Sequence, residues 1–311
     1  MATSIHVRPV YRSYGGENVK GRPGYYSKAL CLASFLRATE HASVTPVFLN
    51  DGPIDPGLVA LMSRHGDVIQ LSDSPLGMRA SYRAALEHPL KVGWSDDEVA
   101  YFCEDDYLHR AEAFSELGEA AACIPDASYF ALYGGTPRHP VFGPGVDLRL
   151  PPGWKHRPDA VVSGRHWVSI PSTASTFGAR VSALRADFGI FRQGMVPYRS
   201  RLLDHETCLV VQGQPPYTAA EVVTGPVATR FRHGPRALAA NAVLAPFRLA
   251  FNLRSMSRRR RPHLLYAADP NLACHLETTF MSPGVDWNSE ATRAAEWAAD
   301  AGLRVPDRRS G

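Results

Sequence analysis

Apolar residues follow two alternating patterns along the first 133 residues of the chain. Short apolar runs bounded by turn residues predict strands, and longer segments with apolar residues at helical spacing predict helices. Strict alternation of the two is typical of βαβ units, so we expect an α/β fold with a mostly parallel central sheet flanked by helices. The expected strands are residues 4–12, 44–49, 68–71, 99–103 and 128–133, and the expected helices are 27–39, 56–64, 77–87 and 111–123.

The pattern changes after residue 133. Residues 134–158 are rich in proline and glycine and lack a regular period, which predicts a long loop. Two further strands, one helix, a long helical pattern from residue 235 and a terminal helix follow, at 161–170, 176–184, 204–211, 235 onwards and 289–302. We therefore divide the chain into an α/β half at 1–133, a second half of the same domain at 134–234 and a helical C-terminal extension at 235–311.

Composition narrows the class of protein. Of the 311 residues, 45% are hydrophobic and 21% charged, which is the profile of an ordinary soluble globular protein. The sequence shows no apolar stretch of about 20 residues and no signal-peptide pattern, so we expect a cytoplasmic location. The cysteines are scattered and lack CxxC spacing, which argues against a zinc knuckle or a disulfide framework. We expect them to be reduced core residues.

Positive charge is concentrated in four consecutive arginines at 258–261. The net charge of +4 is modest, and we expect no nucleic-acid partner. The arginines follow a mostly apolar stretch at 237–253, and two interpretations stay open. They are cations that favour the carboxyl end of a helix, or they belong to an amphipathic element that rests peripherally on anionic lipid at the inner face of a membrane.

Three adjacent acids, Glu104, Asp105 and Asp106, follow directly on the apolar run at 99–103. Ligands of parallel sheets bind outside the carboxyl ends of the strands, so these carboxylates are expected at the mouth of the sheet. Side chains two residues apart share one face of a strand, so we expect Glu104 and Asp106 to converge on one cation while Asp105 points elsewhere. Oxygen ligands favour Mn²⁺ or Mg²⁺. A solvated acidic turn is the alternative.

The sequence FCEDDYL at 102–108 resembles the metal-binding motif of the GT-A fold of nucleotide-sugar glycosyltransferases, in particular family-2-like members. Asn50-Asp51-Gly52 resembles the turn whose aspartate contacts the nucleotide in these enzymes, and residues 77–83 resemble the helix start after their third strand. The resemblance covers roughly the first half of the chain, with thinner similarity at 176–211. Cys103 is a departure, because many relatives carry an aspartate there.

The resemblance implies a hexosyltransferase-type enzyme (EC 2.4) that moves a sugar from a UDP- or GDP-type donor to a small-molecule or lipid-linked acceptor. Residues 1–133 would bind the nucleotide sugar and 134–234 the acceptor, and a metal ion on Glu104 and Asp106 would act as Lewis acid on the diphosphate. Arg79 and Arg83 are four residues apart, so they share a helix face that could clamp phosphate or simply be solvated. The residues expected at the nucleotide are Arg12, Tyr14, Asp51, Arg79, Arg83 and Asp105.

Inverting transfer also needs a general base for the acceptor hydroxyl. In similar transferases an acid at the start of a helix after the acceptor-side strands has this role, so Asp204 and Glu206 are the candidate catalytic residues. Asp204 is equally well explained as a helix N-cap. His205 between them could relay protons, and a downstream histidine, His233 or His275, could complete the metal shell.

Two other functions stay open at the level of sequence. A sugar nucleotidyltransferase uses a similar sheet and normally carries a glycine-rich basic loop after its first strand, and GGENVKGR at 15–22 keeps that alternative open although its spacing is not that of a P-loop. The other is a non-catalytic nucleotide- or sugar-binding protein of the same fold, because fold does not imply activity.

Overall fold

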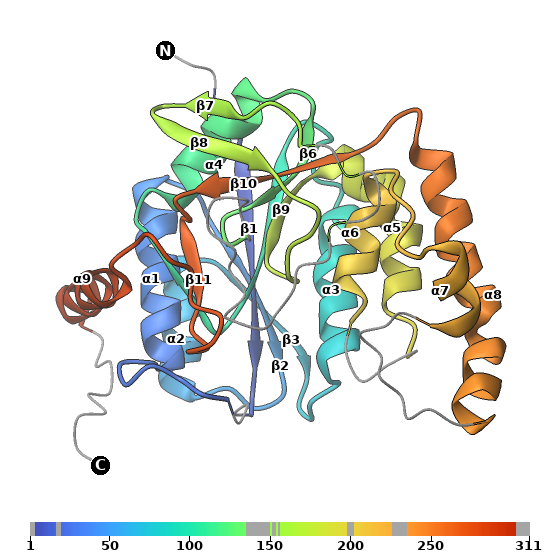
Figure 1. Cartoon of the computed structure of the whole chain (residues 1–311). Coiled ribbons are helices and arrows are strands. Elements are labelled where there is room, and N and C mark those ends of the chain that lie inside the picture. The colour runs from blue at the N-terminus through green and yellow to red at the C-terminus, as the bar shows by residue number, and fades with distance from the viewer. Residues whose placement is uncertain are drawn as a thin grey trace.

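A computed structural model of the chain describes residues 4–16, 20–134, 150, 154, 156–197, 202–225 and 235–302. In this part of the chain, helices and strands alternate as far as β4, and from β5 on strands and helices are mostly grouped (Figure 1). The helices are α1 (Lys28–His41), α2 (Pro56–His65), α3 (Met78–Lys91), α4 (Ala113–Cys123), α5 (Val181–Gly194), α6 (Asp204–Val211), α7 (Ala219–Thr224), α8 (Pro235–Arg258) and α9 (Trp287–Asp300). The strands are β1 (Val7–Tyr14), β2 (Val47–Asp51), β3 (Asp67–Ser72), β4 (Val99–Glu104), β5 (Tyr107–His109), β6 (Ala127–Ala131), β7 (Ala160–Val162), β8 (Arg165–Ser169), β9 (Phe177–Arg180), β10 (Leu264–Asp269) and β11 (Ala273–His275).

Nine strands form one sheet in the order β3-β2-β1-β4-β9-β6-β10-β8-β7. β1 pairs in parallel with β2 and β4, β2 with β3, and β6 with β10. β9 runs antiparallel between β4 and β6, and the β7–β8 hairpin lies antiparallel against β10. The predicted fold class, a mostly parallel sheet flanked by helices, is therefore confirmed.

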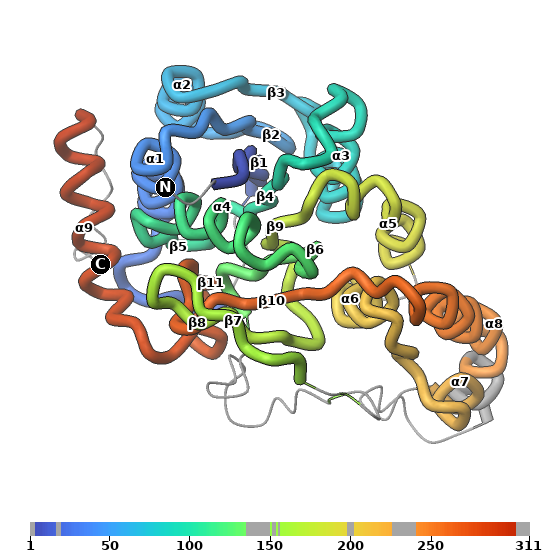
Figure 2. Tube along the Cα trace, turned by 90° about the horizontal axis from the view of Figure 1, so that it is seen from above, coloured from blue at the N-terminus to red at the C-terminus, as the bar shows by residue number. Residues whose placement is uncertain are grey.

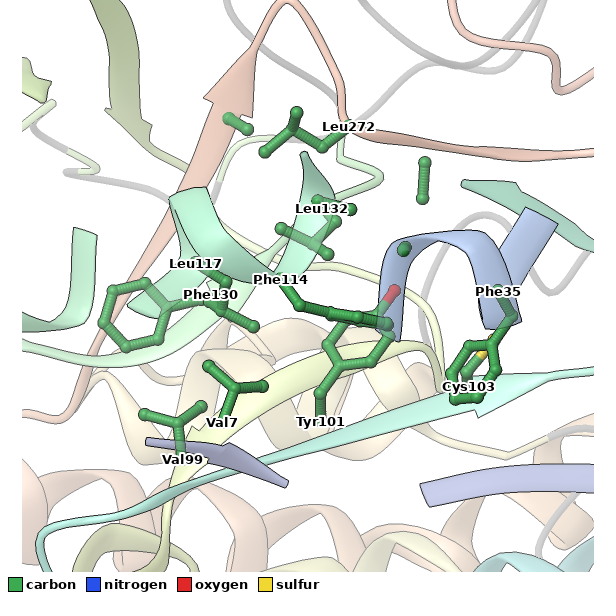
Figure 3. Packing of buried hydrophobic residues seen from close by; sticks show 14 of the residues in the cluster. Val7, Phe35, Val99, Tyr101, Cys103, Phe114, Leu117, Phe130, Leu132 and Leu272 are labelled. Atoms are coloured by element: carbon green, nitrogen blue, oxygen red, sulfur yellow. The ribbon is translucent and has the colours of Figure 1, made fainter. Parts of the chain in front are cut away.

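The sheet is buried on both faces, which is why its central strands are apolar without interruption. Along β4, Val99, Tyr101 and Cys103 point into a core with α1, α2 and α4 (Figure 3). Ala100 and Phe102 point into a second core on the opposite face, with α3, α5, α6 and α8. Figure 2, seen along the sheet from above, shows these two groups of helices on opposite sides of the central strands.

A third core lies outside the first group of helices. The side chains of Leu30 and Cys31 on α1 pack against Trp287 and Ala291 on α9. Next to this contact, β11 pairs antiparallel with β5 in a separate two-stranded sheet. The end of the chain is thereby brought beside the segment that follows the acidic residues.

Several expected elements need correction. The apolar run at 176–184 is a strand only to Arg180, where the chain turns into α5. The segment after residue 235, expected as helices and loop, also supplies β10 and β11. The sequence did not indicate α7 or β5. Most of the expected loop at 134–158, and His233, lie outside the described residues.

The expected reduced state of the cysteines is consistent with the structure, because all five are free. Three of them are buried and Cys123 is exposed at the end of α4. In the described part of the chain, no helix combines the length and the apolar character needed to cross a membrane.

Candidate functional site

The candidate site lies where β1, β2 and β4 end. These strands are parallel neighbours, so their carboxyl ends meet at one edge of the sheet. Tyr14 ends β1, Asp51 ends β2 and Glu104 ends β4. The edge therefore gathers the acids and several of the residues expected at a nucleotide.

Asp106 occupies the turn between β4 and β5 and is only 5% exposed. Three cationic or ionisable groups converge on its Oδ2 atom: Arg22 Nη2 at 3.0 Å, Lys20 Nζ at 3.4 Å and His275 Nε2 at 3.0 Å. Lys20 also lies 3.3 Å from Glu277. Residues distant in sequence thus form one compact charged cluster, which we call the Asp106 cluster: Lys20, Arg22, Asp106, His275 and Glu277.

Backbone hydrogen bonds hold the three segments of the Asp106 cluster together. Leu276 N donates to the Asp106 carbonyl at 2.9 Å, and Thr278 N donates to the Gly21 carbonyl at 2.9 Å. Arg22 Nη1 adds a bond of 2.8 Å to the Leu276 carbonyl. The relative placement of the side chains therefore rests on main-chain contacts as well as on charge.

Aromatic rings orient the His275 imidazole. It stacks on Tyr107 with ring centroids 5.0 Å apart and lies nearly parallel to Phe280 at 6.4 Å. Tyr133 meets it edge-on, and its hydroxyl donates to the Phe280 carbonyl at 2.7 Å. Packing from both faces restricts rotation of the ring, so Nε2 is kept pointing at Asp106.

The electrostatics of Asp106 favour the ionised carboxylate. Burial alone would raise its pKa, but the hydrogen bond and charge of His275, with Lys20 and Arg22, hold the pKa well below its usual range. Its second oxygen, Oδ1, is buried without a hydrogen-bond partner among the described residues. A buried carboxylate oxygen without a donor is a free ligand atom in a site crowded with positive charge.

Asp105 has side-chain partners other than those of Asp106 and holds the end of β1 in place. Its Oδ2 accepts from Tyr14 N at 2.9 Å and pairs with Lys28 Nζ at 3.0 Å. Burial raises the pKa of Asp105, although Lys28 acts in the opposite direction. Lys28 also donates to the carbonyls of Tyr14 and Gly16, so this network fixes the loop after β1.

Glu104 and Asp106 have different partners. Glu104 forms an ion pair with Arg12, whose guanidinium also donates to Ser81 Oγ at 3.1 Å and lies 5.6 Å from the centre of the Tyr82 ring. β4 ends at Glu104 and the chain turns at the next two residues, so the strand alternation behind the expected convergence does not extend to Asp106.

The other residues expected at the nucleotide surround the start of α3. Asp51 accepts from Leu76 N at 2.6 Å and Gly77 N at 3.1 Å, and so holds the loop that begins this helix. Arg79 follows in the first turn and is half-buried. Arg83 is exposed and pairs with Glu87 one turn later, at 2.6 Å.

The expected acceptor side is an apolar pocket between α3, β6, β9, α5 and α6. Asp204, the first residue of α6, lines it. Tyr82 lines it too, and the Asp204 charge contributes to the raised pKa of the Tyr82 phenol, after burial. Because the Tyr82 ring also lies under Arg12, one residue connects the pocket to the Arg12–Glu104 pair. The lining residues are Tyr82, Tyr129, Thr173, Ala174, Phe177, Phe191, Gly194, Leu202, Asp204, Thr207, Cys208, Val211 and Leu265.

The two neighbours of Asp204 in the sequence have separate surroundings. His205 Nδ1 lies 2.9 Å from Ser172 Oγ. Glu206 is buried, and the Tyr217 hydroxyl donates to its Oε1 at 3.4 Å. The side chains of Asp204 and Glu206 therefore have different surroundings, and of the two it is Asp204 that lines the pocket. Leu203 occupies the N-cap position of α6, and Asp204 is the first helical residue.

Sequence reasoning missed Lys20, Arg22 and Lys28 as site residues. Lys20 and Arg22 belong to the basic loop at 15–22, which was noted only for its glycines and for the nucleotidyltransferase alternative. Lys28 gave no signal beyond its position one residue after the helix cap Ser27.

The described residues contain no group of three or more histidine, cysteine, aspartate or glutamate side chains placed to hold a metal ion by themselves. Mg²⁺ and similar ions at phosphate sites commonly use one or two protein ligands, with substrate phosphates and water as the others. Asp106 and His275 offer an oxygen and a nitrogen to such a shared site.

The large sheet places the antiparallel β9 beside β4 and brings the acids to the end of β4. Among solved structures, the chain is similar to S. aureus TarS 1–349, with a TM-score of 0.43 and 11% identity, covering 82% of this chain and 89% of that one. It is also similar to 4-diphosphocytidyl-2C-methyl-D-erythritol synthase, with a TM-score of 0.34 and 10% identity, covering 65% of this chain and 84% of the other. No protein-family model and no curated protein matches the chain.

Proposed function

We propose that the chain is a metal-dependent glycosyltransferase that moves a sugar from a UDP- or GDP-type donor to a small-molecule or lipid-linked acceptor. The observation that carries this proposal is the Asp106 cluster, in which a buried carboxylate at the end of β4 meets His275, Lys20 and Arg22. Such a cluster suits a diphosphate, because it offers both an anchor for a divalent ion and cationic donors for phosphate oxygens.

Asp106 and His275 fit a divalent ion, and they would hold it together with the diphosphate. Asp106 has an unpartnered buried oxygen, and the His275 ring is held with Nε2 towards the carboxylate. A bound Mn²⁺ or Mg²⁺ would supply a Lewis acid for the departing nucleoside diphosphate. Lys20 and Arg22 would bind the phosphate oxygens directly, and Arg22 is well placed for this since its guanidinium is fixed by Tyr26 and the Leu276 carbonyl.

In this proposal Asp204 takes the proton from the acceptor hydroxyl. Its position on the wall of an apolar pocket supports the role, because an acceptor bound in this pocket would lie beside the carboxylate. Tyr82 and Arg12 connect the pocket to Glu104, which supports a donor side and an acceptor side that adjoin one another. Glu206 has a structural role in our proposal, since it is buried against Tyr217.

A sugar nucleotidyltransferase is the second candidate, and one observation favours it. Lys20 and Arg22 come from the basic loop after β1, the place where nucleotidyltransferases normally carry such residues, and both reach Asp106. The two functions differ in the nucleotide, because a nucleotidyltransferase consumes a nucleoside triphosphate and releases pyrophosphate.

Calorimetric titration with UDP and GDP, with and without Mn²⁺, tests the proposal on wild type, Asp106→Asn and His275→Gln. We expect Mn²⁺-dependent binding of one nucleotide that weakens by a factor of about 10 to 100 in either variant, the usual loss for a changed ligand or its partner. The matched control is Asp97→Asn, an exposed carboxylate at the other end of β4. Metal-independent binding that Asp106→Asn leaves unchanged would contradict the metal site. Pyrophosphate release from a nucleoside triphosphate and a sugar phosphate would favour the second candidate.

A further inference from the structure

Helix α8 exposes an apolar face to solvent. Val243 is 77% exposed, Leu249 47%, Leu253 57% and Met256 53%. Leu249, Leu253 and Met256 are three or four positions apart, so they lie along one side of the helix, and Val243 lies at the edge of the same exposed surface. A surface helix of a globular protein normally turns charged and polar residues outward. The exposed side of α8 is instead made of Ala242, Val243, Pro246, Leu249, Ala250, Leu253 and Met256, with Arg254 and Ser257.

The opposite side of α8 fixes the helix in this orientation. Phe251 is fully buried and packs against Phe247 and Tyr217. Arg248 is fully buried and donates to the carbonyls of Val222 and Asn241, at 2.8 and 2.5 Å. Rotation of α8 to cover its apolar face would break these contacts, so the face is a stable feature of the surface.

Basic residues follow the apolar face at the end of α8. Arg258 turns inward, where it forms an ion pair with the buried Asp187 and donates to the Ala186 carbonyl at 2.8 Å. The next three arginines, 259–261, are exposed, and within the described residues no carboxylate lies within ion-pair distance of them or of Arg254. Arg258 therefore stabilises the fold, whereas arginines 259–261 face solvent.

We propose that this surface, the apolar face of α8 with Arg254 and arginines 259–261, docks on an anionic membrane. Apolar side chains beside arginines match the two layers of a lipid interface, acyl chains and acidic headgroups. A second copy of the chain is a poorer partner, because α8 contains no acidic residue and self-contact would leave its arginines unpaired.

The docking surface lies at the side of the molecule. Figures 1 and 2 both place α8 at the end opposite α9, with its outer face free of other described elements. α6, which carries Asp204, packs on the inner side of α8. Helix α8 would thus lie between a membrane on its outer face and α6, which lines the apolar pocket. Docking does not depend on the proposed sugar transfer, but it would bring a lipid-linked acceptor to the acceptor side.

Vesicle flotation of the full chain tests the proposal, with phosphatidylcholine vesicles and with vesicles that also contain phosphatidylglycerol. We expect binding only to the anionic vesicles, and weaker binding in higher salt because the surface charges are screened. Replacing Arg259, Arg260 and Arg261 with glutamine should weaken binding by about a hundredfold. Leu253→Gln combined with Met256→Gln should weaken it by about tenfold or more, through lost apolar insertion.

Two control variants distinguish vesicle binding through this surface from binding through positive charge or exposed apolar residues elsewhere on the protein. Val161→Gln changes an exposed apolar residue on β7, and Arg185→Gln with Arg192→Gln removes exposed arginines on α5. Both should bind like wild type. Absence of vesicle binding, or binding that the α8 variants retain, overturns the proposal. Concentration-dependent dimerisation that Leu253→Gln abolishes, without vesicle binding, would assign the face to a second copy instead. Flotation needs neither nucleotide nor metal, so its failure is distinguishable from failure of the proposed transferase activity.

Discussion

His109 is a fully buried imidazole beside the strand that leads to the acids. Its Nε2 lies 3.0 Å from the Tyr101 hydroxyl and 3.8 Å from Cys103 Sγ. Burial lowers the pKa of His109 to about 3, and a backbone hydrogen bond to Tyr107 only partly offsets this. The imidazole is therefore neutral in the folded protein at any ordinary pH, and it works as a packing and hydrogen-bonding group behind the site.

The lowered pKa of His109 makes stability depend on pH. The unfolded chain protonates this histidine below about pH 6.5, whereas the folded chain does so only near pH 3, so its contribution to stability is lost as pH falls between these values. We expect a slope of up to about 1.4 kcal/mol in the free energy of unfolding per pH unit. Urea unfolding between pH 5 and 7 should show this slope reduced in His109→Gln. The exposed His41→Gln should keep it, and equal slopes in wild type and His109→Gln would contradict the assignment.

In the candidate site, the sequence indicated the acids more readily than the basic residues that contact them. The acids stood out because three carboxylates follow a buried strand, and His275 could be named as a metal-shell candidate from the resemblance. Lys20 and Arg22 could not be placed, because they come from a loop and meet Asp106 across more than 80 residues of sequence. β4 ends at Glu104, two residues before Asp106, and the two acids have different side-chain partners, so their joint binding of a cation stays a prediction.

Among the elements, those with long local patterns were predictable and those made by contacts were not. The strands β1 to β4 and helices α1 to α4 lie close to their expected ranges, and α6 matches residues 204–211. α5 was missed because Val181, Ala183 and Leu184 continue the apolar run of β9. The strands β5 and β11 are three residues long, which is too short for a hydrophobic period to predict them. Each is defined by its pairing with the other.

Arg248 joins two helices, and its removal should loosen both. It donates to the carbonyls at the end of α7 and to that of Asn241 within α8. In Arg248→Leu these carbonyls lose the donor that the fully buried guanidinium supplies, so we expect the free energy of unfolding to fall by about 2 to 4 kcal/mol. Chemical denaturation measures this, with the exposed Arg254→Leu on the same helix as control. A loss in Arg248→Leu no larger than in the control would show that other contacts join α7 to α8.

On the scale of the whole molecule, the C-terminal part of the chain contributes a strand to the interior of the large sheet. β10 comes from the last part of the sequence, yet it lies between β6 and β8 within the large sheet (Figure 1). The segment after residue 235 is consequently part of the main core: Leu265 and Ala267 pack in the same cluster as β6 and α5.

Hydrogen exchange should report this integration. Amides of β10 pair on both sides and are buried, so they should exchange as slowly as those of β6, through global unfolding. Amides of β7, the edge strand of the same sheet, should exchange faster by local opening and serve as the internal reference. Mass-spectrometric exchange at peptide level resolves the three strands. Rapid exchange in β10 with protection in β6 would mean that the C-terminal segment opens independently.

The contact between Asp106 and His275 joins residues 169 positions apart, and this separation matters while the protein is being made. At typical ribosome speeds of about 5 to 20 residues per second, the acids leave the peptidyl-transferase centre roughly 10 to 30 seconds before their histidine is added. Throughout that interval the nascent chain carries the acidic turn without β11 or the stacked imidazole. The Asp106 cluster is thus completed late in translation, after the strands β1 to β9 have already been synthesised.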